Sequence, residues 1–207
     1  HAQVIHSAGS DLLSLINDVL DMAKIEAGKI ELAPETFVVE ELCQSLTATI
    51  APLAINKSNN LEVEIEPLIG TIHSDRTRLR QILLNLLSNA NKFTQKDEII
   101  LRAKTQVQGQ QAMLVIEIED HGDGMDEETQ RSIFEGFSQG VNALKTRHKG
   151  TGLGLTITRQ FTHLLGGKVE LDSALGEGST FRVTIPVIWT LEQSEDLMHP
   201  TEAEDED

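Results

Sequence analysis

The stretch from Arg78 to Phe93 constrains the fold more than any other part of the sequence. Read at the period of a helix, its apolar residues gather on one face, which we expect to be buried: Leu79, Ile82, Leu83, Leu86, Leu87 and Ala90. Asn85, Asn89 and Lys92 follow at i, i+4 and i+7, so they form a polar stripe beside that face.

This polar stripe has two interpretations. Polar groups at a buried edge are costly unless something polar lies beside them. An asparagine oxygen suits a hard cation, and a lysine suits phosphate oxygens, so the stripe indicates a metal–phosphate ligand. An ordinary amphipathic helix with polar residues at its border explains the same pattern equally well.

Charge excludes one class of partner. The formal net charge is −16, from 17 basic and 33 acidic residues. Residues 191–207 hold eight of the acidic residues and no Lys or Arg, which leaves −8 for the rest. Nucleic acid would be repelled.

The sequence also gives an expectation of the cellular compartment. Cys43 stands alone, so a disulfide framework is not expected. No apolar run approaches the ~20 residues that a bilayer requires, and no signal peptide is visible. We therefore expect a cytoplasmic piece without direct membrane contact, whose parent protein can still carry a membrane segment upstream.

The first 31 residues are expected to form a long bundle helix. Apolar residues recur in steps of three and four, the rhythm of a coiled coil or bundle: Ile5, Ala8, Leu12, Leu15, Val19 and Met22. Such a narrow seam requires a partner helix, which we expect in another chain or an upstream segment. Docking onto this chain's own domain is the alternative.

The remaining pattern predicts an α/β two-layer sandwich, with one mixed, mainly antiparallel sheet and helices on a single face. Residues 31–35 indicate a hinge, and Asp75 is placed to cap the central helix. A second helix is expected over residues 37–57, bent or shortened at Pro52. The other expected elements are strands at 61–65, 71–73, 99–105, 112–119, 169–172 and 180–186, and helices at 126–134 and 153–165. We expect residues 32–190 to form one domain and 191–207 an acidic tail or linker.

Glycines follow one of these strands in the run Asp120-His-Gly122-Asp-Gly124. A carboxylate at a strand end can accept a hydrogen bond from an exocyclic amine such as that of adenine. Gly122 and Gly124 would let the backbone approach a flat ring and adopt positive φ. An ordinary turn is the alternative.

A second cluster, Gly150, Gly152 and Gly154, opens a helix. Backbone N–H groups at a helix start form an anion site, to which Arg147 would add positive charge. A flexible loop before a helix is the alternative, and the pattern is not a Walker loop. The third cluster, residues 176–181, predicts a tight turn that leads into an edge strand.

Taken in order, these pieces resemble the catalytic and ATP-binding domain of sensor histidine kinases, within the wider superfamily of gyrase, mismatch-repair and chaperone ATPases. The resemblance covers about residues 37–186. Residues 81–94 resemble the family's asparagine box, 120–124 its first glycine box, 133–137 its phenylalanine box and 150–155 its second glycine box. Residues 1–30 resemble the second helix of the dimerisation domain, in the style that is commonest in hybrid kinases.

The resemblance implies a fold of the Bergerat type that binds ATP and Mg²⁺. Asn85, Asn89 and Lys92 would be catalytic, with Asn89 as the Mg²⁺ ligand and Lys92 on phosphate. Asp120 would accept from the adenine amine, and residues 135–150 would form a mobile lid. The residues that it places around the nucleotide are Asn85, Asn89, Lys92, Phe93, Asp120, Gly122, Gly124, Arg147, Gly150, Thr151, Gly152, Leu153 and Gly154.

The chain departs from the family in several places. Lys149 and Gly136 replace a frequent glycine and a frequent proline, and neither His1 nor His6 begins the family's phosphoacceptor motif. We therefore expect the acceptor helix upstream in a parent protein, and we expect this chain alone not to phosphorylate itself. The implied partners are that helix, a response-regulator receiver domain and a second copy of the parent.

Two other functions remain open from the sequence. The first is an ATPase of the wider superfamily, but those enzymes usually place Glu where Asn85 stands, and Asn cannot act as a base. The second is a module without nucleotide that acts by helix pairing through residues 1–29.

Overall fold

The computed structural model describes residues 2–134 and 152–190. The helices and strands are α1 (Ala2–Glu26), β1 (Glu35–Val38), α2 (Val39–Asn56), β2 (Asn60–Ile65), β3 (Thr71–Ser74), α3 (Arg76–Phe93), β4 (Glu98–Gln108), β5 (Gln111–Asp120), α4 (Glu127–Ser132), α5 (Gly154–Leu164), β6 (Lys168–Ala174) and β7 (Gly178–Pro186).

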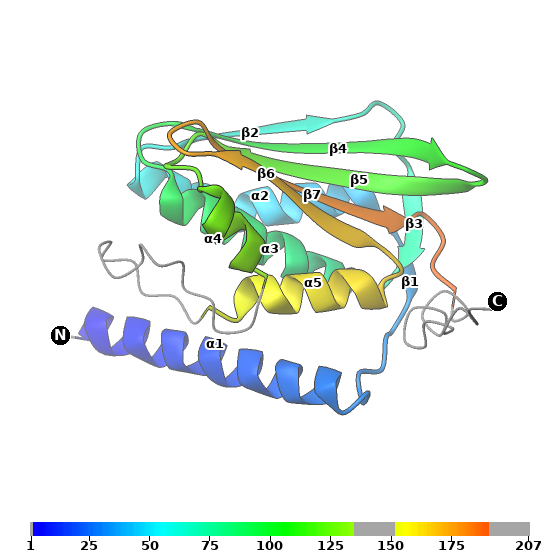
Figure 1. Cartoon of the computed structure of the whole chain (residues 1–207), viewed down its shortest axis with the longest axis horizontal. Helices are drawn as coiled ribbons and strands as arrows, with labels where there is room; N and C mark the ends of the chain where they lie inside the picture. The colour runs from blue at the N-terminus through cyan, green and yellow to red at the C-terminus, as the bar shows by residue number, and fades with distance from the viewer. Residues whose placement is uncertain (1, 135–151, 191–207) are drawn as a thin grey trace, which may run out of the picture.

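The main sheet has five strands in the order β2-β4-β5-β7-β6. β2 pairs with β4 in parallel, and the other three pairs are antiparallel. Helices α2, α3 and α5 form a layer on one face of this sheet (Figure 1). The predicted two-layer sandwich with a mixed, mainly antiparallel sheet is confirmed.

The two faces of the sheet differ in chemistry because side chains alternate along each strand. Toward the helices, Leu101 of β4 and Ile116 of β5 are buried in the core. On the other face, Arg182 of β7 donates from Nε to Glu117 Oε1 at 2.7 Å, and Arg102 of β4 pairs with Glu119. An apolar inner face and an ion-paired outer face are what a sheet covered on one side requires.

Helix α3 lies at the centre of the helix layer. All six apolar residues that predicted its buried face are at most 3% exposed. The Asp75 carboxylate accepts from the N–H of Arg78 at 2.9 Å, which confirms the predicted cap. It also accepts from the N–H of Ala33 at 2.9 Å, so the same side chain fixes the segment that leads out of α1.

The region around Phe37 differs from the prediction. Phe37 belongs to β1, which pairs with β3 in a separate two-stranded antiparallel sheet, so α2 begins at Val39. Helix α2 then continues through Pro52 to Asn56, and the predicted shortening is wrong. The carbonyl that loses its helical donor at Pro52 is that of Ala48, and both residues are exposed, so water can replace that bond.

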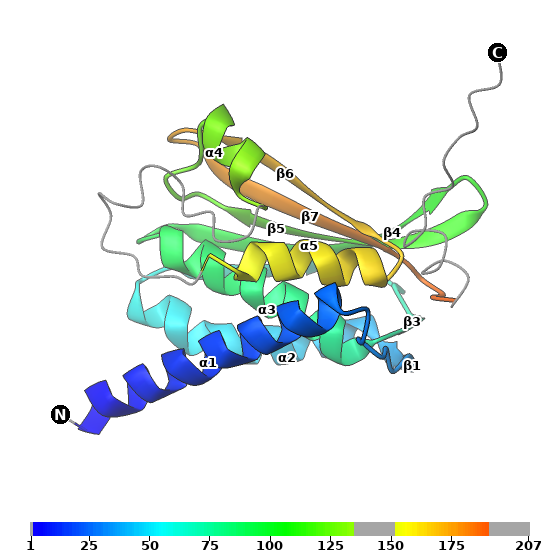
Figure 2. The same cartoon turned by 60° about the horizontal axis from the view of Figure 1, so that its bottom comes forward.

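Helix α1 lies on the other side of the helix layer from the sheet (Figure 2). Leu15 and Ile25 pack against the core of the chain's own domain, as the docking alternative expected. Leu12 and Val19 of the expected seam are 56% and 48% exposed. One side of α1 is therefore docked and another is open. Among the described helices, none is long and apolar enough to cross a membrane.

Candidate functional site

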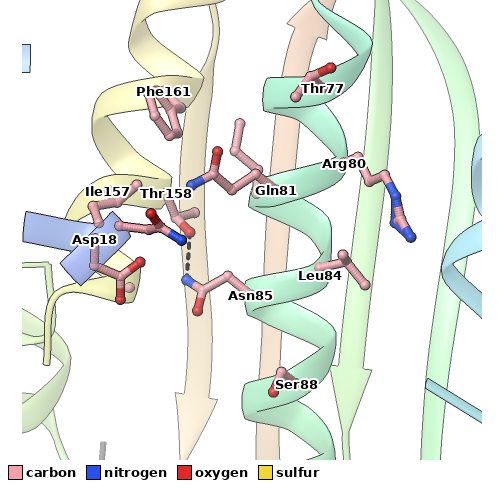
Figure 3. A pocket seen from close by; sticks show the side chains of 13 residues that line it. Asp18, Thr77, Arg80, Gln81, Leu84, Asn85, Ser88, Ile157, Thr158 and Phe161 are labelled. Carbon is pink, nitrogen blue, oxygen red and sulfur yellow. Dashed lines mark hydrogen bonds between the residues drawn. The ribbon is translucent and has the colours of Figure 1, made fainter. Parts of the chain in front are cut away.

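The polar stripe of α3 lies where the sequence places it, at the edge of the buried face. Asn85, Asn89 and Lys92 are each half-buried. Asn85 Nδ2 donates to Thr158 Oγ1 of α5 at 2.8 Å (Figure 3). This partner was missed in the sequence, although a run of threonines on an otherwise apolar helix face could have drawn attention to it.

The start of α5 meets α3 at Asn85. A Cβ atom on Gly154 would lie 2.5 Å from Asn85 Oδ1, so a larger residue there would displace the Asn85 side chain from this position. Gly152 has a φ of +73°, a conformation that glycine adopts without strain. The side chain of Leu153 is 1% exposed and belongs to the core, so it cannot contact a ligand. The structure thus brings the asparagine box and the second glycine box together.

Asp120 ends β5 and is 5% exposed. Its Oδ1 accepts from the N–H of Gly122 at 3.0 Å. Burial raises the pKa of the Asp120 carboxyl to about 6, because water no longer solvates its charged form fully. A Cβ on Gly122 would lie 2.6 Å from the carbonyl oxygen of Phe93. The first glycine box therefore packs directly against the end of α3.

Lys92 and Phe93 are the last two residues of α3. Lys92 Nζ lies 4.9 Å from the centre of the Phe93 ring, which is 45% exposed. Burial lowers the pKa of Lys92, and the nearby charge of Lys57 lowers it further. An anion beside Lys92 would offset both effects, so the position suits a phosphate group.

Gly124 and Gly178 have a role that the sequence did not indicate. Gly124 has a φ of +63°, and a Cβ there would lie 1.9 Å from the carbonyl oxygen of Ala174. Gly178 has a φ of +94°, and a Cβ there would lie 2.0 Å from the carbonyl oxygen of Asp120. These glycines let the loop after β5 pack on the β6–β7 turn. β7 pairs with both β5 and β6, so the prediction that this turn leads into an edge strand is wrong.

A cavity of about 470 Å³ lies between α1, α3 and α5 (Figure 3). Asn85 and Gly154 line it, together with Asp18 of α1. Asn89, Lys92, Phe93, Asp120, Gly122, Gly124, Gly152 and Leu153 are not among its lining residues. The predicted residues Arg147, Gly150 and Thr151, and the predicted lid, lie outside the described residues.

The phenylalanine box is described in part. Phe134 packs edge-on against Phe181 of β7, with ring centres 6.4 Å apart. Within the described residues, no three His, Cys, Asp or Glu side chains form a group that could hold a metal ion.

A family model described as histidine kinase-, DNA gyrase B-, and HSP90-like ATPase matches residues 74–188. This chain belongs to that family. The matched range holds both glycine boxes, the central helix and four of the five strands of the main sheet.

Two relatives narrow the family to sensor histidine kinases. Sensor histidine kinase GacS of Pseudomonas protegens is 38% identical over 202 residues, which cover 95% of this chain and 22% of that protein. Hybrid signal transduction histidine kinase B of Dictyostelium discoideum is 38% identical over 88% of this chain and 9% of that protein. The chain thus spans a quarter or less of the length of these relatives, and within them it corresponds to the catalytic ATPase domain of a two-component sensor histidine kinase.

Two solved structures share the fold of this histidine kinase domain. Full-length ShkA, solved in complex with AMPPNP, matches with a TM-score of 0.78 and 33% identity, over 89% of this chain and 37% of that one. Histidine kinase ThkA, solved in complex with the response regulator protein TrrA, matches with a TM-score of 0.67 and 20% identity, over 88% of this chain and 49% of that one. The second likeness is evidence of fold alone.

Proposed function

We propose that this histidine kinase domain holds Mg·ATP among the end of β5, the C-terminal half of α3 and the start of α5, and that the γ-phosphoryl group passes to a histidine outside this chain. The observation that carries the proposal is the close approach of the three elements. Gly154 allows α5 to meet Asn85, and Gly122 allows the loop after β5 to meet Phe93.

The chemistry of the residues fits this ligand. The half-buried amide of Asn89 offers a carbonyl oxygen to Mg²⁺, and the ammonium of Lys92 offers donors to phosphate. The Asp120 carboxylate has two oxygens, so while one accepts from Gly122 the other can accept from the adenine amine. The exposed ring of Phe93 offers an apolar surface to the base.

Bound Mg·ATP would supply the phosphoryl group. The lone pair of an imidazole nitrogen would attack the γ-phosphorus, and the bond between that phosphorus and the leaving oxygen of ADP would break. The residues of this chain act by positioning the nucleotide and neutralising its charge. Asn85 is a neutral amide that cannot take a proton from water, so we expect at most slow hydrolysis. We also propose that this chain alone does not phosphorylate itself.

The partners follow from the same proposal. The acceptor histidine would lie on a helix of the parent protein, and the parent would act as a dimer in the cytoplasm. By analogy with the complex of ThkA and TrrA, the phosphoryl group would then pass to a response-regulator receiver domain.

Calorimetry with AMPPNP tests the nucleotide site. We expect binding in the presence of Mg²⁺, and we expect Asn89→Ala to weaken it at least about tenfold, the effect of losing roughly 1.4 kcal/mol. With EDTA, the wild-type chain should bind as weakly as the variant. Asn56→Ala, at the exposed end of α2, is the matched control and should bind like the wild type.

Two results would contradict the proposal. The first is an absence of ATP and ADP binding with Mg²⁺ present. The second is covalent ³²P on this chain after incubation with γ-labelled ATP, which would place an acceptor inside it.

A further inference from the structure

Thr158 lies inside the interface between α3 and α5 and is 1% exposed. Its Oγ1 accepts from Asn85 Nδ2 at 2.8 Å. In Figure 3, the side chain of Asn85 points from α3 toward Thr158 on α5, whereas Arg80 points away from α5. The hydroxyl of Thr158 therefore faces a residue of the candidate nucleotide site without belonging to any of the motifs around it.

The bond to Thr158 determines what the rest of the Asn85 amide can do. A carboxamide has an acceptor end and a donor end, and rotation by half a turn exchanges them. With Nδ2 held by Thr158, the whole amide lies against Gly154, because Oδ1 is 2.5 Å and Nδ2 is 2.9 Å from the position of the missing Cβ. The amide of Asn85 thus lies beside the first residue of α5.

The surroundings make this hydrogen bond costly to lose. Thr158 is fully buried and Asn85 is half-buried, so removing the hydroxyl would leave the amide N–H without the partner that it has in this structure. Burial in the packed interface between α3 and α5 restricts the Thr158 side chain, so its hydroxyl is a fixed partner for the amide.

We propose that Thr158 is a positioning residue, which holds the Asn85 carboxamide against the start of α5 before the nucleotide binds. This inference rests on the proposed function, because it deepens the role of Asn85 in that site. The amide is held beside the part of the site that would receive the metal–phosphate end of Mg·ATP, and an amide that is already held in place loses less freedom when the ligand arrives.

The test uses two variants of Thr158 and one matched control. Thr158→Val keeps the shape of the side chain and removes the hydroxyl, and Thr158→Ser keeps the hydroxyl. Thr162→Val is the matched control, because Thr162 is also buried on α5 and its hydroxyl bonds to the backbone of Thr158. Thermal unfolding of each variant establishes that it is folded before any other measurement.

The first readout is independent of nucleotide. In ¹H–¹⁵N spectra, the Asn85 side-chain amide should show slowed hydrogen exchange in the wild type, in Thr158→Ser and in Thr162→Val. In Thr158→Val that protection should be lost. An Asn85 amide that is equally protected in Thr158→Val would overturn the proposal, whether or not the chain binds nucleotide.

The second readout is the affinity for Mg·AMPPNP. Thr158→Val should bind about fivefold to tenfold more weakly, the effect expected from the loss of one hydrogen bond. Thr158→Ser should recover most of the affinity, and in an Asn85→Ala background the Thr158→Val change should have little further effect. A Thr158→Ser variant as weak as Thr158→Val would assign the effect to packing and overturn the proposal. Lack of binding by the wild type would instead contradict the proposed function.

Discussion

At Asp120, stability and the proposed ligand binding favour opposite protonation states. Burial raises the pKa of this carboxyl from 3.8 to about 6, so the folded chain holds the proton more tightly than the unfolded chain does. Asp120 therefore favours the folded state at low pH, and the free energy of unfolding should fall as the pH rises from about 4 to about 6. In the proposed site, the charged form would be the stronger acceptor for the adenine amine.

Asp120→Asn should separate these two effects. The variant removes a buried charge and keeps an oxygen that can accept from Gly122, so at pH 7.5 we expect the free energy of unfolding to rise by about 1–3 kcal/mol. At pH 4.5 most of this gain should disappear. Affinity for ATP should fall, because one carboxylate acceptor is lost.

Urea unfolding at the two pH values and calorimetry with Mg·ATP measure these quantities. Glu128→Gln, which changes an exposed acidic residue of α4, should alter neither. A loss of stability in Asp120→Asn at pH 7.5 would show that the buried charge is compensated in the folded state.

The sequence predicted which polar residues lie at the edge of a buried face, but it did not predict which residues they contact. The positions of Asn85 and Asp120 follow from helical spacing and from the end of a strand. Thr158 could not be assigned to Asn85, because the two residues lie 73 positions apart and only the packing of α5 on α3 brings them together. Likewise, Gly124 could not be assigned to packing on Ala174 before the pairing of the strands was known.

At the scale of elements, the connection between α2 and β2 holds the end of α3. Asn59 Nδ2 donates to Asn91 Oδ1 and to the carbonyl oxygen of Thr94, each at 3.0 Å, and all three residues are buried. Lys57 Nζ donates to the carbonyl oxygen of Lys92 at 2.6 Å. These bonds fix the last turn of α3, which carries two residues of the candidate site.

Asn59→Ala should therefore destabilise the chain. The change leaves two buried acceptors without their donor, so we expect a loss of about 2–4 kcal/mol in the free energy of unfolding. Asn60→Ala is the matched control, because the Asn60 amide bonds to Glu98 at the exposed edge of the sheet, and it should cost less than about 0.5 kcal/mol. Urea unfolding of both variants checks this, and equal losses would contradict the role of Asn59.

The strands that alternate were predicted from their own residues, as β2 and β4 show. β1 was missed because its residues were assigned to the hinge and to the start of the second helix. The pairing that makes it a strand joins Phe37 to Ile72 of β3, which lies 35 positions away. The prediction also placed too much weight on Pro52, whose effect depends on whether solvent reaches the freed carbonyl.

At the scale of the whole molecule, α1 is joined to the domain by a polar contact. Gln81 Nε2 donates to Asp21 Oδ2 at 2.8 Å, and Arg78 Nη1 lies 3.4 Å from Asp21 Oδ1. The same guanidinium lies 4.6 Å from the ring centre of Phe161 in α5. One carboxylate of α1 is thus tied to α3, and through Arg78 to α5.

Asp21→Ala should loosen α1 without unfolding the domain. We expect backbone amides of residues 15–26 to exchange with solvent about tenfold faster, which corresponds to the loss of hydrogen bonds to a charged group. Amides of β4 and β5 should keep their protection. Hydrogen exchange measured by mass spectrometry checks this, with Glu26→Ala, an exposed acidic residue of the same helix, as the control. Unchanged exchange in α1 would mean that apolar packing alone holds it.

The sequence predicted that α1 would form a long helix with an apolar seam, and it left open where the helix would lie. Heptad spacing describes one stripe, whereas the docked side of α1 mixes apolar Leu15 and Ile25 with charged Asp21. A contact made by both apolar and charged residues produces no regular spacing of apolar residues in the sequence. The boundary between residues 1–31 and 32–190 stays a prediction.

Helix α3 is touched by α1 near one end and carries Lys92 at the other. Fourteen residues separate Arg78 from Lys92, which corresponds to roughly 21 Å along a straight helix. The contact with α1 and the ammonium group of Lys92 therefore lie on one continuous helix, so a movement of that helix as a unit would change both positions together.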